Sequence, residues 1–451
     1  MRIIIVGCGN VGFTLIEELA KEGHQITAID AKNERVKDVV DKFDIMGYCG
    51  DGASSELLKE AGIETAELLI AITANDETNI LCCLIGKKLG NCHTIARVRN
   101  PQHTKDVDLL KDELGLSLSI NPELATANSM ARMLKFPSAM KVSDFGKGLV
   151  EVVTFSVDKD SILCGVYLKD IRNKLKTDTL IIAAERNHEI IIPDGNFQIL
   201  EGDKLSIVAD SYNATSFLQR ASRKFKHISK VMIVGGGSTG YYLAEKLIET
   251  GIQVKIIEIN KERCMELCDL LPKATIIHGD GTDRHLLLEE GIESMDAFVS
   301  MAKIDEENMM LSLYANTFDD LKVITRVHRP NYVDLVDKLN VGNVVYPRVE
   351  AAEIIASYVR AMNNSINSNV EALHRLLNER VEALEFWIKE TSAVTGIPLK
   401  DLKTKDSVLI ACIIHQGNII IPGGMNTIEV GDSVIVTSSE QGLNDITDIL
   451  R

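Results

Sequence analysis

Three glycines near the start of the chain have the spacing of a loop that binds nucleotide phosphates. Gly7, Gly9 and Gly12 form G-x-G-x-x-G directly after an apolar run that ends at Val6. The first glycine permits a tight turn, the second lets the backbone approach a pyrophosphate, and the third lets a helix pack closely on the strand. Backbone N–H groups at the start of that helix then face the phosphates. The predicted chemistry is therefore phosphate binding, not bond breaking.

An acidic residue follows these glycines at the distance expected for contact with a ribose. Asp30 lies 18 residues beyond Gly12 (30 − 12), close to the roughly 20 residues found in dinucleotide-binding folds. It ends a second apolar run at residues 26–29. Strand, glycine turn, helix, strand and acid therefore occur in the order of a dinucleotide-binding unit.

The same arrangement occurs a second time. An apolar run at residues 231–234 leads into Gly235, Gly237 and Gly240, and Glu258 again follows the last glycine by 18 residues (258 − 240). Other sequences recur at a displacement of 229 residues: Gly-Asp-Gly at 50–52 and 279–281, and Arg-Val at 97–98 and 326–327. Displacement that stays nearly constant over such a length indicates a tandem duplication.

Each copy begins with short apolar strands that alternate with helical patterns. In the first copy we expect strands at 3–6, 25–29, 45–49, 68–73, 94–98 and 117–120, and helices at 11–21, 33–43, 54–61, 76–89 and 102–114. This alternation predicts an α/β fold with a doubly wound, Rossmann-like parallel sheet covered on both faces. A helix should follow at 122–135, and a longer helical run is expected at 350–384 in the second copy.

Each copy ends with a small module that has a different pattern. Short alternating or apolar runs, turns and one short helix predict an α+β domain of about 70 residues. The expected domains are dinucleotide-binding at 1–135 and 228–360, and small α+β at 136–221 and 370–451.

Three further kinds of residue are candidates for ligand contact, because they follow strands at the carboxyl edge of the sheet. Thr73 either touches the ligand or belongs to a helix cap made by the residues after it. Arg97 is either a phosphate or intersubunit ligand or a surface ion pair. Asp51 and Asp280 either border an adenine or only shape a Gly-Asp-Gly turn.

Composition excludes several classes of protein. The chain has 451 residues and a net charge of −16, which argues against nonspecific binding to nucleic acid or anionic lipid. No apolar run approaches the roughly 18–20 residues of a membrane span, and we expect a cytosolic protein without a signal peptide. The nine cysteines show no zinc spacing, so no metal site is predicted. A thiol at Cys8, near a helix start, is a candidate for acidification.

No catalytic set accompanies the glycine motifs, so we do not expect an enzyme. A dehydrogenase of this fold adds a domain with a general acid or base, whereas the small modules are poor in histidine. His188 and His415 fall in expected turns without an evident partner.

These duplicated motifs together resemble the TrkA family, the peripheral regulatory subunits of Trk-type potassium uptake systems. The resemblance covers the whole chain as two RCK (KTN) domains, each followed by a TrkA-C domain. It implies a cytoplasmic homotetramer that docks on an integral membrane Trk potassium channel at the inner face of the membrane. It also implies gating by bound NAD(H), with ATP or ADP as further candidates.

The resemblance and the motifs together give the expected nucleotide-binding positions. In the first copy they are Gly7, Cys8, Gly9, Asn10, Val11, Gly12, Asp30, Asp51, Thr73, Ala74 and Arg97. In the second copy they are Gly235, Gly236, Gly237, Ser238, Thr239, Gly240, Glu258 and Asp280. Some related regulators carry an arginine after the second glycine, where this chain has Asn10 and Ser238; the difference favours NAD at the first site.

Two other functions remain open from the sequence. A regulatory subunit of a cation/proton antiporter would use the same domains, and co-purification of the membrane partner would separate it from a potassium regulator. An NAD-dependent dehydrogenase is disfavoured by the duplicated small module and the missing acid/base set.

Overall fold

The computed structural model describes residues 1–100, 113–221, 227–329, 341–365, 370–377, 380–440, 442–443 and 445–451, with the single residues 107, 336 and 339. They form two compact units. One comprises Met1–Ala131 and Ser229–Ala356, and the other Arg132–Ile228 and Ser357–Arg451. Each unit therefore combines one part from each copy of the duplication. Within the described ranges, no helix is both long and apolar enough to cross a membrane.

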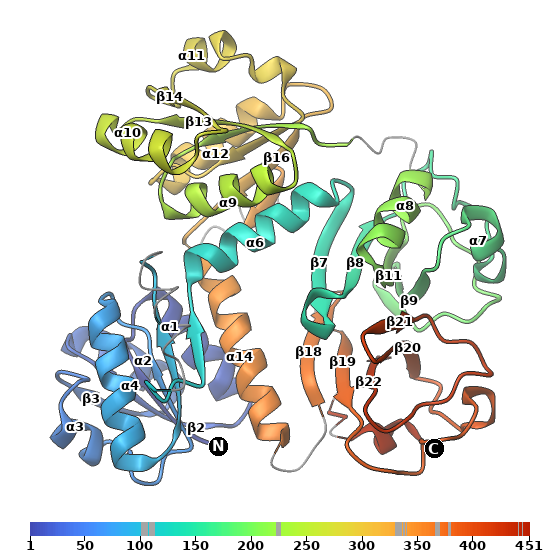
Figure 1. The fold of residues 1–451 in the computed structure, drawn as a ribbon, viewed down its shortest axis with the longest axis horizontal. Coiled ribbons are helices and arrows are strands. Elements are labelled where there is room, and N and C mark those ends of the chain that lie inside the picture. Colours follow the sequence, from blue (N-terminus) through green and yellow to red (C-terminus); the bar gives the residue numbers. More distant parts are fainter. Residues whose placement is uncertain are drawn as a thin grey trace. The chain divides into compact units, whose positions relative to one another are not determined.

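Six parallel strands form the first sheet of the first unit, which lies in the part of the chain coloured mostly blue in Figure 1. They are β1 (Arg2–Val6), β2 (Gln25–Asp30), β3 (Met46–Cys49), β4 (Leu68–Ala71), β5 (His93–Arg97) and β6 (Leu118–Ile120), in the spatial order β3-β2-β1-β4-β5-β6. The direction of winding changes between β1 and β4. Ligands of such sheets bind beyond the carboxyl ends of the strands at this point.

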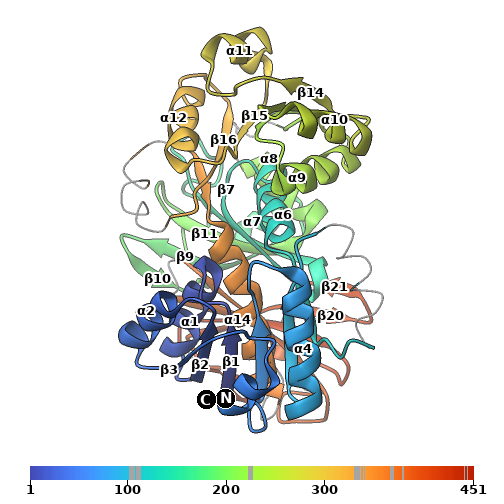
Figure 2. The ribbon, with the colours of Figure 1, turned by 90° about the vertical axis from the view of Figure 1, so that its left-hand side faces the viewer.

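Helices cover both faces of this sheet, as Figure 2 shows. α1 (Asn10–Lys21) and α2 (Asn33–Phe43) lie on one face and α4 (Asp76–Gly90) on the other, where α3 (Ser55–Glu60) packs against α4. The helix α1 buries Leu15, Ile16 and Leu19, which are spaced to share one helical face. Residues 3–6 of the central strand β1 are buried as well, because a strand covered on both faces has no solvent side.

The second copy repeats this architecture within the same unit. Its strands are β12 (Lys230–Val234), β13 (Gln253–Glu258), β14 (Thr275–His278), β15 (Ala297–Ser300), β16 (Lys322–Arg326) and β17 (Asn343–Val345), in the order β14-β13-β12-β15-β16-β17. Its helices are α9 (Ser238–Glu249), α10 (Lys261–Leu270), α11 (Arg284–Glu289) and α12 (Asp305–Ala315). The predicted doubly wound fold is confirmed in both copies.

A proline-initiated helix follows the sixth strand of each copy. These helices are α6 (Pro122–Lys135) and α14 (Pro347–Ser365). Proline suits the first turn of a helix because its fixed φ is helical and its missing N–H would have no partner there.

Two antiparallel sheets make up the second unit. The first contains β7 (Ala139–Phe145), β8 (Val150–Ser156), β9 (Leu180–Arg186), β10 (Glu189–Ile191) and β11 (Lys204–Asp210), with α7 (Leu168–Leu175) and α8 (Ser211–Ala221). The second contains β18 (Val370–Leu376), β19 (Val381–Trp387), β20 (Val408–His415), β21 (Asn418–Ile420) and β22 (Ser433–Ser438). One apolar cluster, which includes Val152, Ile182, Ala383 and Ile435, joins the two sheets.

The structure corrects two expectations about these modules. The helical run expected at 350–384 ends at Ser365, and β18 and β19 follow it. Residues 139–145, to which we assigned no structure, form β7. The helix expected at 102–114 lies largely outside the described residues.

We expect Gly12→Ala to destabilise the first domain. A Cβ at Gly12 would lie 1.9 Å from the carbonyl oxygen of Gly7, so backbone would have to move. Such overpacking costs about 1–3 kcal/mol. Gly9→Ala is the matched control, since the nearest atom to its added Cβ is 3.9 Å away and its φ of −72° suits alanine. Thermal unfolding followed by circular dichroism should show a lower Tm for Gly12→Ala alone; equal losses would refute the packing argument.

Candidate functional site

The first glycine turn connects β1 to α1 and leaves the start of that helix uncapped. Gly7 has a φ of +105°, a conformation that favours glycine. Gly9 is the N-cap residue of α1 and has extended backbone, with no side chain bonded to the first N–H groups of the helix. Such groups carry the positive end of the helix dipole and can donate to a phosphate.

Asp30 holds this turn against the end of β2. One carboxylate oxygen, Oδ2, accepts the N–H of Cys8 at 2.7 Å, and the other, Oδ1, accepts the N–H of Lys32 at 2.8 Å. The side chain is 7% exposed, and the guanidinium of Arg35 lies 3.8 Å from Oδ2. The acid therefore stands beside the turn, as predicted from its spacing, and each oxygen retains a lone pair for a ribose hydroxyl.

Cys8 is not the acidified thiol that its position suggested. Its side chain is buried, with Sγ 3.8 Å from the carbonyl oxygen of Ile29. Burial, and secondly the charge of Asp30, raise the pKa of the Cys8 thiol to about 12. A thiol with this environment stays protonated and behaves as a small apolar group.

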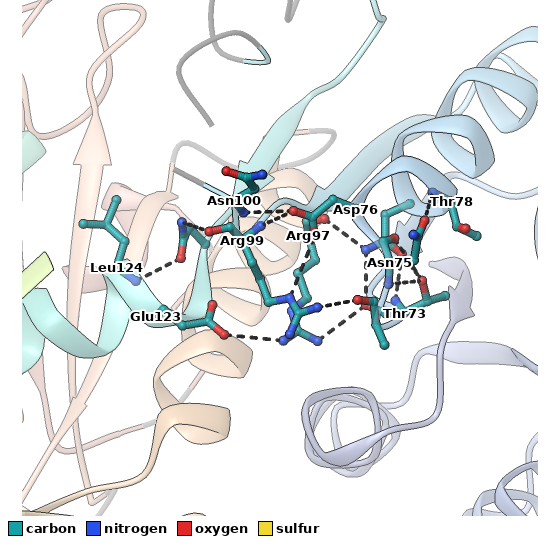
Figure 3. Close-up of polar contacts among 12 residues, drawn as sticks. Thr73, Asn75, Asp76, Thr78, Arg97, Arg99, Asn100, Glu123 and Leu124 are labelled. Carbon is teal, nitrogen blue, oxygen red and sulfur yellow. Dashed lines mark hydrogen bonds and ion pairs between the residues drawn. The ribbon is translucent and has the colours of Figure 1, made fainter. Parts of the chain in front are cut away.

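A hydrogen-bonded network fixes the carboxyl ends of β4 and β5 (Figure 3). The buried Asn79 accepts the N–H of Thr73 at 2.8 Å and its hydroxyl at 2.7 Å, and donates to the carbonyl of Arg97 at 3.0 Å. Asn75 caps α4 by accepting the N–H of Thr78 at 2.6 Å. Asn75 therefore caps the helix, which was the second of the two alternatives for this segment. Its neighbour Thr73 does not cap the helix, and hydrogen bonds to Asn79 fix the orientation of its side chain.

The side chain of Arg97, whose backbone belongs to this network, is largely buried. Its side chain is 16% exposed, and one terminal nitrogen, Nη2, lies 3.8 Å from Glu123 Oε1 (Figure 3). Burial lowers the pKa of Arg97, partly offset by the charge of Glu123. A guanidinium held in such a place is suited to a second, anionic partner.

Asp51 takes part in the turn that the Gly-Asp-Gly sequence predicted. Its carboxylate accepts the N–H of Ala53 at 3.0 Å. The equivalent Asp280 accepts both the N–H and the hydroxyl of Thr282, and these bonds lower its pKa. The turn alternative is therefore observed at both aspartates, and contact with an adenine stays a prediction.

The first site is a single cavity of about 690 Å³, within the roughly 300–1,000 Å³ of small-molecule sites. The predicted positions that line it are Gly7, Gly9, Asn10, Val11, Asp30, Asp51, Thr73, Ala74 and Arg97. Cys8 and Gly12 are not among its lining residues and support the turn instead. Among the second-copy predictions Thr239 lines this cavity; Gly235, Gly236, Gly237, Ser238, Gly240, Glu258 and Asp280 do not.

The second glycine turn is held by an acid in the same way as the first, but the neighbouring arginine has a different partner. Glu258 Oε2 accepts the N–H of Gly236 at 2.7 Å and Oε1 that of Asn260 at 2.9 Å, so the longer side chain reaches the equivalent N–H. Arg263 donates from Nε to the carbonyl of Gly236 at 2.8 Å. At the first turn the corresponding Arg35 lines the cavity.

Several cavity residues were not predicted from the sequence. Lys32, Arg35 and Glu123 belong to the first copy, and Arg326, His328 and Arg348 to the second. The 229-residue match of Arg97 with Arg326 was a signal for one of them. Nothing in the order of residues along the chain indicates that second-copy side chains reach the first site.

The histidines of the small modules are partly bonded. His415 lies with Nδ1 2.6 Å from Asp432 Oδ1, so the expectation that it lacks a partner is wrong. His188 Nδ1 is 3.7 Å from Glu185. Among the described residues, no group of three or more His, Cys, Asp or Glu side chains is placed to hold a metal ion.

Comparison with known families gives two domain types, each present twice. The TrkA-N domain matches residues 3–122 and 231–347, and the TrkA-C domain matches 152–220 and 383–451. Similar curated proteins include the Trk system potassium uptake protein TrkA of Halomonas elongata, 32% identical over 97% of this chain and 95% of that protein. TrkA homolog 1 of Methanosarcina mazei is 31% identical, with 99% of each chain covered.

Solved structures support the same fold. The GsuK RCK domain has a TM-score of 0.62 at 16% identity, covering 97% of this chain and 92% of that one. The GsuK channel bound to NAD has a TM-score of 0.64 at 17% identity, covering 97% and 76%. The relatives are named as potassium uptake proteins and channel domains and not as enzymes, which confirms that expectation. Two TrkA-N and two TrkA-C domains, in relatives aligned along the whole chain, show that this protein belongs to the TrkA family.

Proposed function

We propose that the chain is a nucleotide-sensing regulatory subunit of a Trk-type potassium uptake system. It binds NAD(H), or ATP or ADP, at the first glycine turn and changes the activity of an integral membrane potassium channel. It works as a homotetramer on the cytoplasmic face of the membrane. The observation that carries the proposal is the cavity bounded by an uncapped helix start, by Asp30 and by Arg97.

The shape and chemistry of this cavity support nucleotide binding at its predicted positions. Donors at the start of α1 suit a pyrophosphate, and Asp30 suits a ribose hydroxyl. NAD is bound in the GsuK channel structure that shares this fold. The TrkA relatives are named for potassium uptake. These names favour regulation of a potassium channel over regulation of a cation/proton antiporter and over dehydrogenase activity.

Gly9→Ala should weaken nucleotide binding at the first site without unfolding the chain. The added methyl group has room, because the nearest atom, Arg35 Nη1, is 3.9 Å away, but it occupies the place where a pyrophosphate approaches the backbone. We expect calorimetry to show a loss of affinity for NAD⁺ or NADH of at least about tenfold, or 1.4 kcal/mol.

Gly237→Ala is the matched variant at the second turn, where an added Cβ meets nothing within 4 Å. If the first site carries the function, this variant binds like the unaltered chain at that site. Unchanged affinity in Gly9→Ala would remove the first turn from the proposal.

Nucleotide should change potassium flux only through a competent first site. We expect vesicles that contain the Trk-type channel and the unaltered chain to change their flux when NAD⁺, NADH, ADP or ATP is added. Vesicles with Gly9→Ala should give a constant flux, because a ligand shifts an equilibrium only through differential affinity for its states. A regulator that binds nucleotide while flux stays the same would contradict the proposal.

A further inference from the structure

A groove of about 690 Å³ lies at the amino-terminal edge of the first parallel sheet, opposite the edge that carries the glycine turn. Its lining includes Arg2, Gln25 and Met46, which are the first residues of β1, β2 and β3. The groove shares no lining residue with the cavity at the first glycine turn, and its volume is in the range of small-molecule sites. It is therefore a separate candidate site within the first dinucleotide-binding domain.

In the second copy, a lysine side chain occupies the corresponding place. Lys255 is the third residue of β13, and Thr27 is the third residue of β2. Glu290 follows α11 as its C-cap residue, and Ala61 follows α3 in the same way. The Nζ of Lys255 donates to the carbonyl of Glu290 at 2.8 Å and to its carboxylate at 2.7 Å. An ammonium group therefore satisfies a carbonyl at the end of a helix, where such groups have no intrahelical partner.

The first copy keeps this carbonyl but lacks the lysine. Thr27 and Ala61 both line the groove. A threonine side chain ends at the γ position, whereas the ammonium group of a lysine is at the ζ position. Within the described ranges, no side chain donates to the carbonyl of Ala61. The first domain therefore has open space and an available acceptor at the place where the second domain binds its own ammonium group.

Two carboxylates make the groove attractive to a cation. Asp44 and Glu60 line it, both are exposed, and neither forms an ion pair within the described structure. Asp44 lies two residues before β3, whereas the second copy has Lys273 two residues before β14. The first copy lacks both Lys255 and Glu290, whose charges cancel. The exchange of lysine for aspartate therefore leaves the first groove more negative than its counterpart.

The basic residues of the lining do not exclude a cation. Arg2 is exposed, and the second copy carries Lys230 at the equivalent first position of β12. The ammonium group of Lys255 is bound in that copy all the same. The ring of His24 also lines the groove, and its Nε2 lies 3.7 Å from Glu22 Oε2, so a carboxylate already faces this imidazole.

We propose that this groove binds an aliphatic primary amine, whose ammonium group donates to the carbonyl of Ala61 as Lys255 donates to that of Glu290. Asp44 and Glu60 attract the charge of the amine. Its alkyl chain lies on the apolar part of the lining, as the stems of lysine side chains do on apolar surfaces. The inference does not rest on the proposed function, because the amine and the nucleotide bind at opposite edges of the sheet.

The experiment uses n-butylamine, which has the four carbons and the ammonium group of a lysine side chain, and n-butanol, which is similar in shape but neutral. Saturation-transfer NMR on the full chain should show saturable binding of n-butylamine and none of n-butanol. The double variant Thr27→Lys with Ala61→Glu rebuilds the second-copy pair and fills the groove with the chain's own ammonium group. We expect it to lose at least about tenfold in affinity for n-butylamine, the loss that follows from one hydrogen bond to a charged group.

Asp44→Asn tests the electrostatic part of the site. Asp44 has a φ of +53°, a conformation that asparagine also adopts, so the turn should persist. Removing this exposed charge should weaken n-butylamine binding about two- to fivefold, the range of exposed ion pairs. The matched control is Asp41→Asn, which removes an exposed carboxylate of α2 outside the groove and should bind n-butylamine normally.

The inference is overturned if the unaltered chain shows no saturable binding of n-butylamine, or if n-butanol binds equally well. Normal binding by the double variant, with its fold checked by circular dichroism, or equal binding by Asp44→Asn and Asp41→Asn would also overturn it. Displacement of n-butylamine by potassium chloride, but not by choline chloride at the same ionic strength, would show that the groove takes a bare cation instead. Should the double variant not fold, the comparisons with n-butanol and with Asp44→Asn still decide the result.

Discussion

A hydrogen bond from the glycine turn to the acid at the end of the second strand determines the geometry of each site. Cys8 donates to Asp30 in the first copy, and Gly236 donates to Glu258 in the second. Both bonds join groups of the same domain, so the fold itself orders the turn. Binding then pays less conformational entropy, since the donors already face the place of the phosphates.

The two copies keep the residues that hold the backbone and differ in those that face the cavity. Asn79 joins the ends of β4 and β5, and Asn308 makes the corresponding bonds to Ala302 and Arg326. Arg35 and Arg263, in contrast, have different partners. One scaffold therefore carries two glycine turns whose neighbouring arginines have different partners, and the fold alone does not show which ligand either turn would prefer.

The sequence predicted most helices and strands of the fold because apolar periodicity and turn residues within each short segment determine them. Apolar strands and glycine spacing gave both parallel sheets, and the acid at Asp30 was placed correctly. The helix predicted over 350–384 was wrong in its second half, because residues 370–376 contain leucine, alanine and glutamate, which favour helices, yet they pair with β19 in a sheet. Tertiary packing overrode the local preference there. Arg348 was missed because its place in the cavity depends on how two distant domains meet, which no local period records.

A cavity lined by both copies links ligand binding to the arrangement of the two domains. A ligand that touches only the first glycine turn stabilises every arrangement equally and shifts none of them. A ligand that also reaches Arg326 and Arg348 gains affinity only in the arrangement that brings these side chains to it. By reciprocity, the bound ligand stabilises this arrangement of the two domains by the same free energy that the arrangement adds to ligand binding. Under the proposed function, two ligands that reach the second copy to different extents would therefore favour different arrangements of the two domains through the same glycine turn.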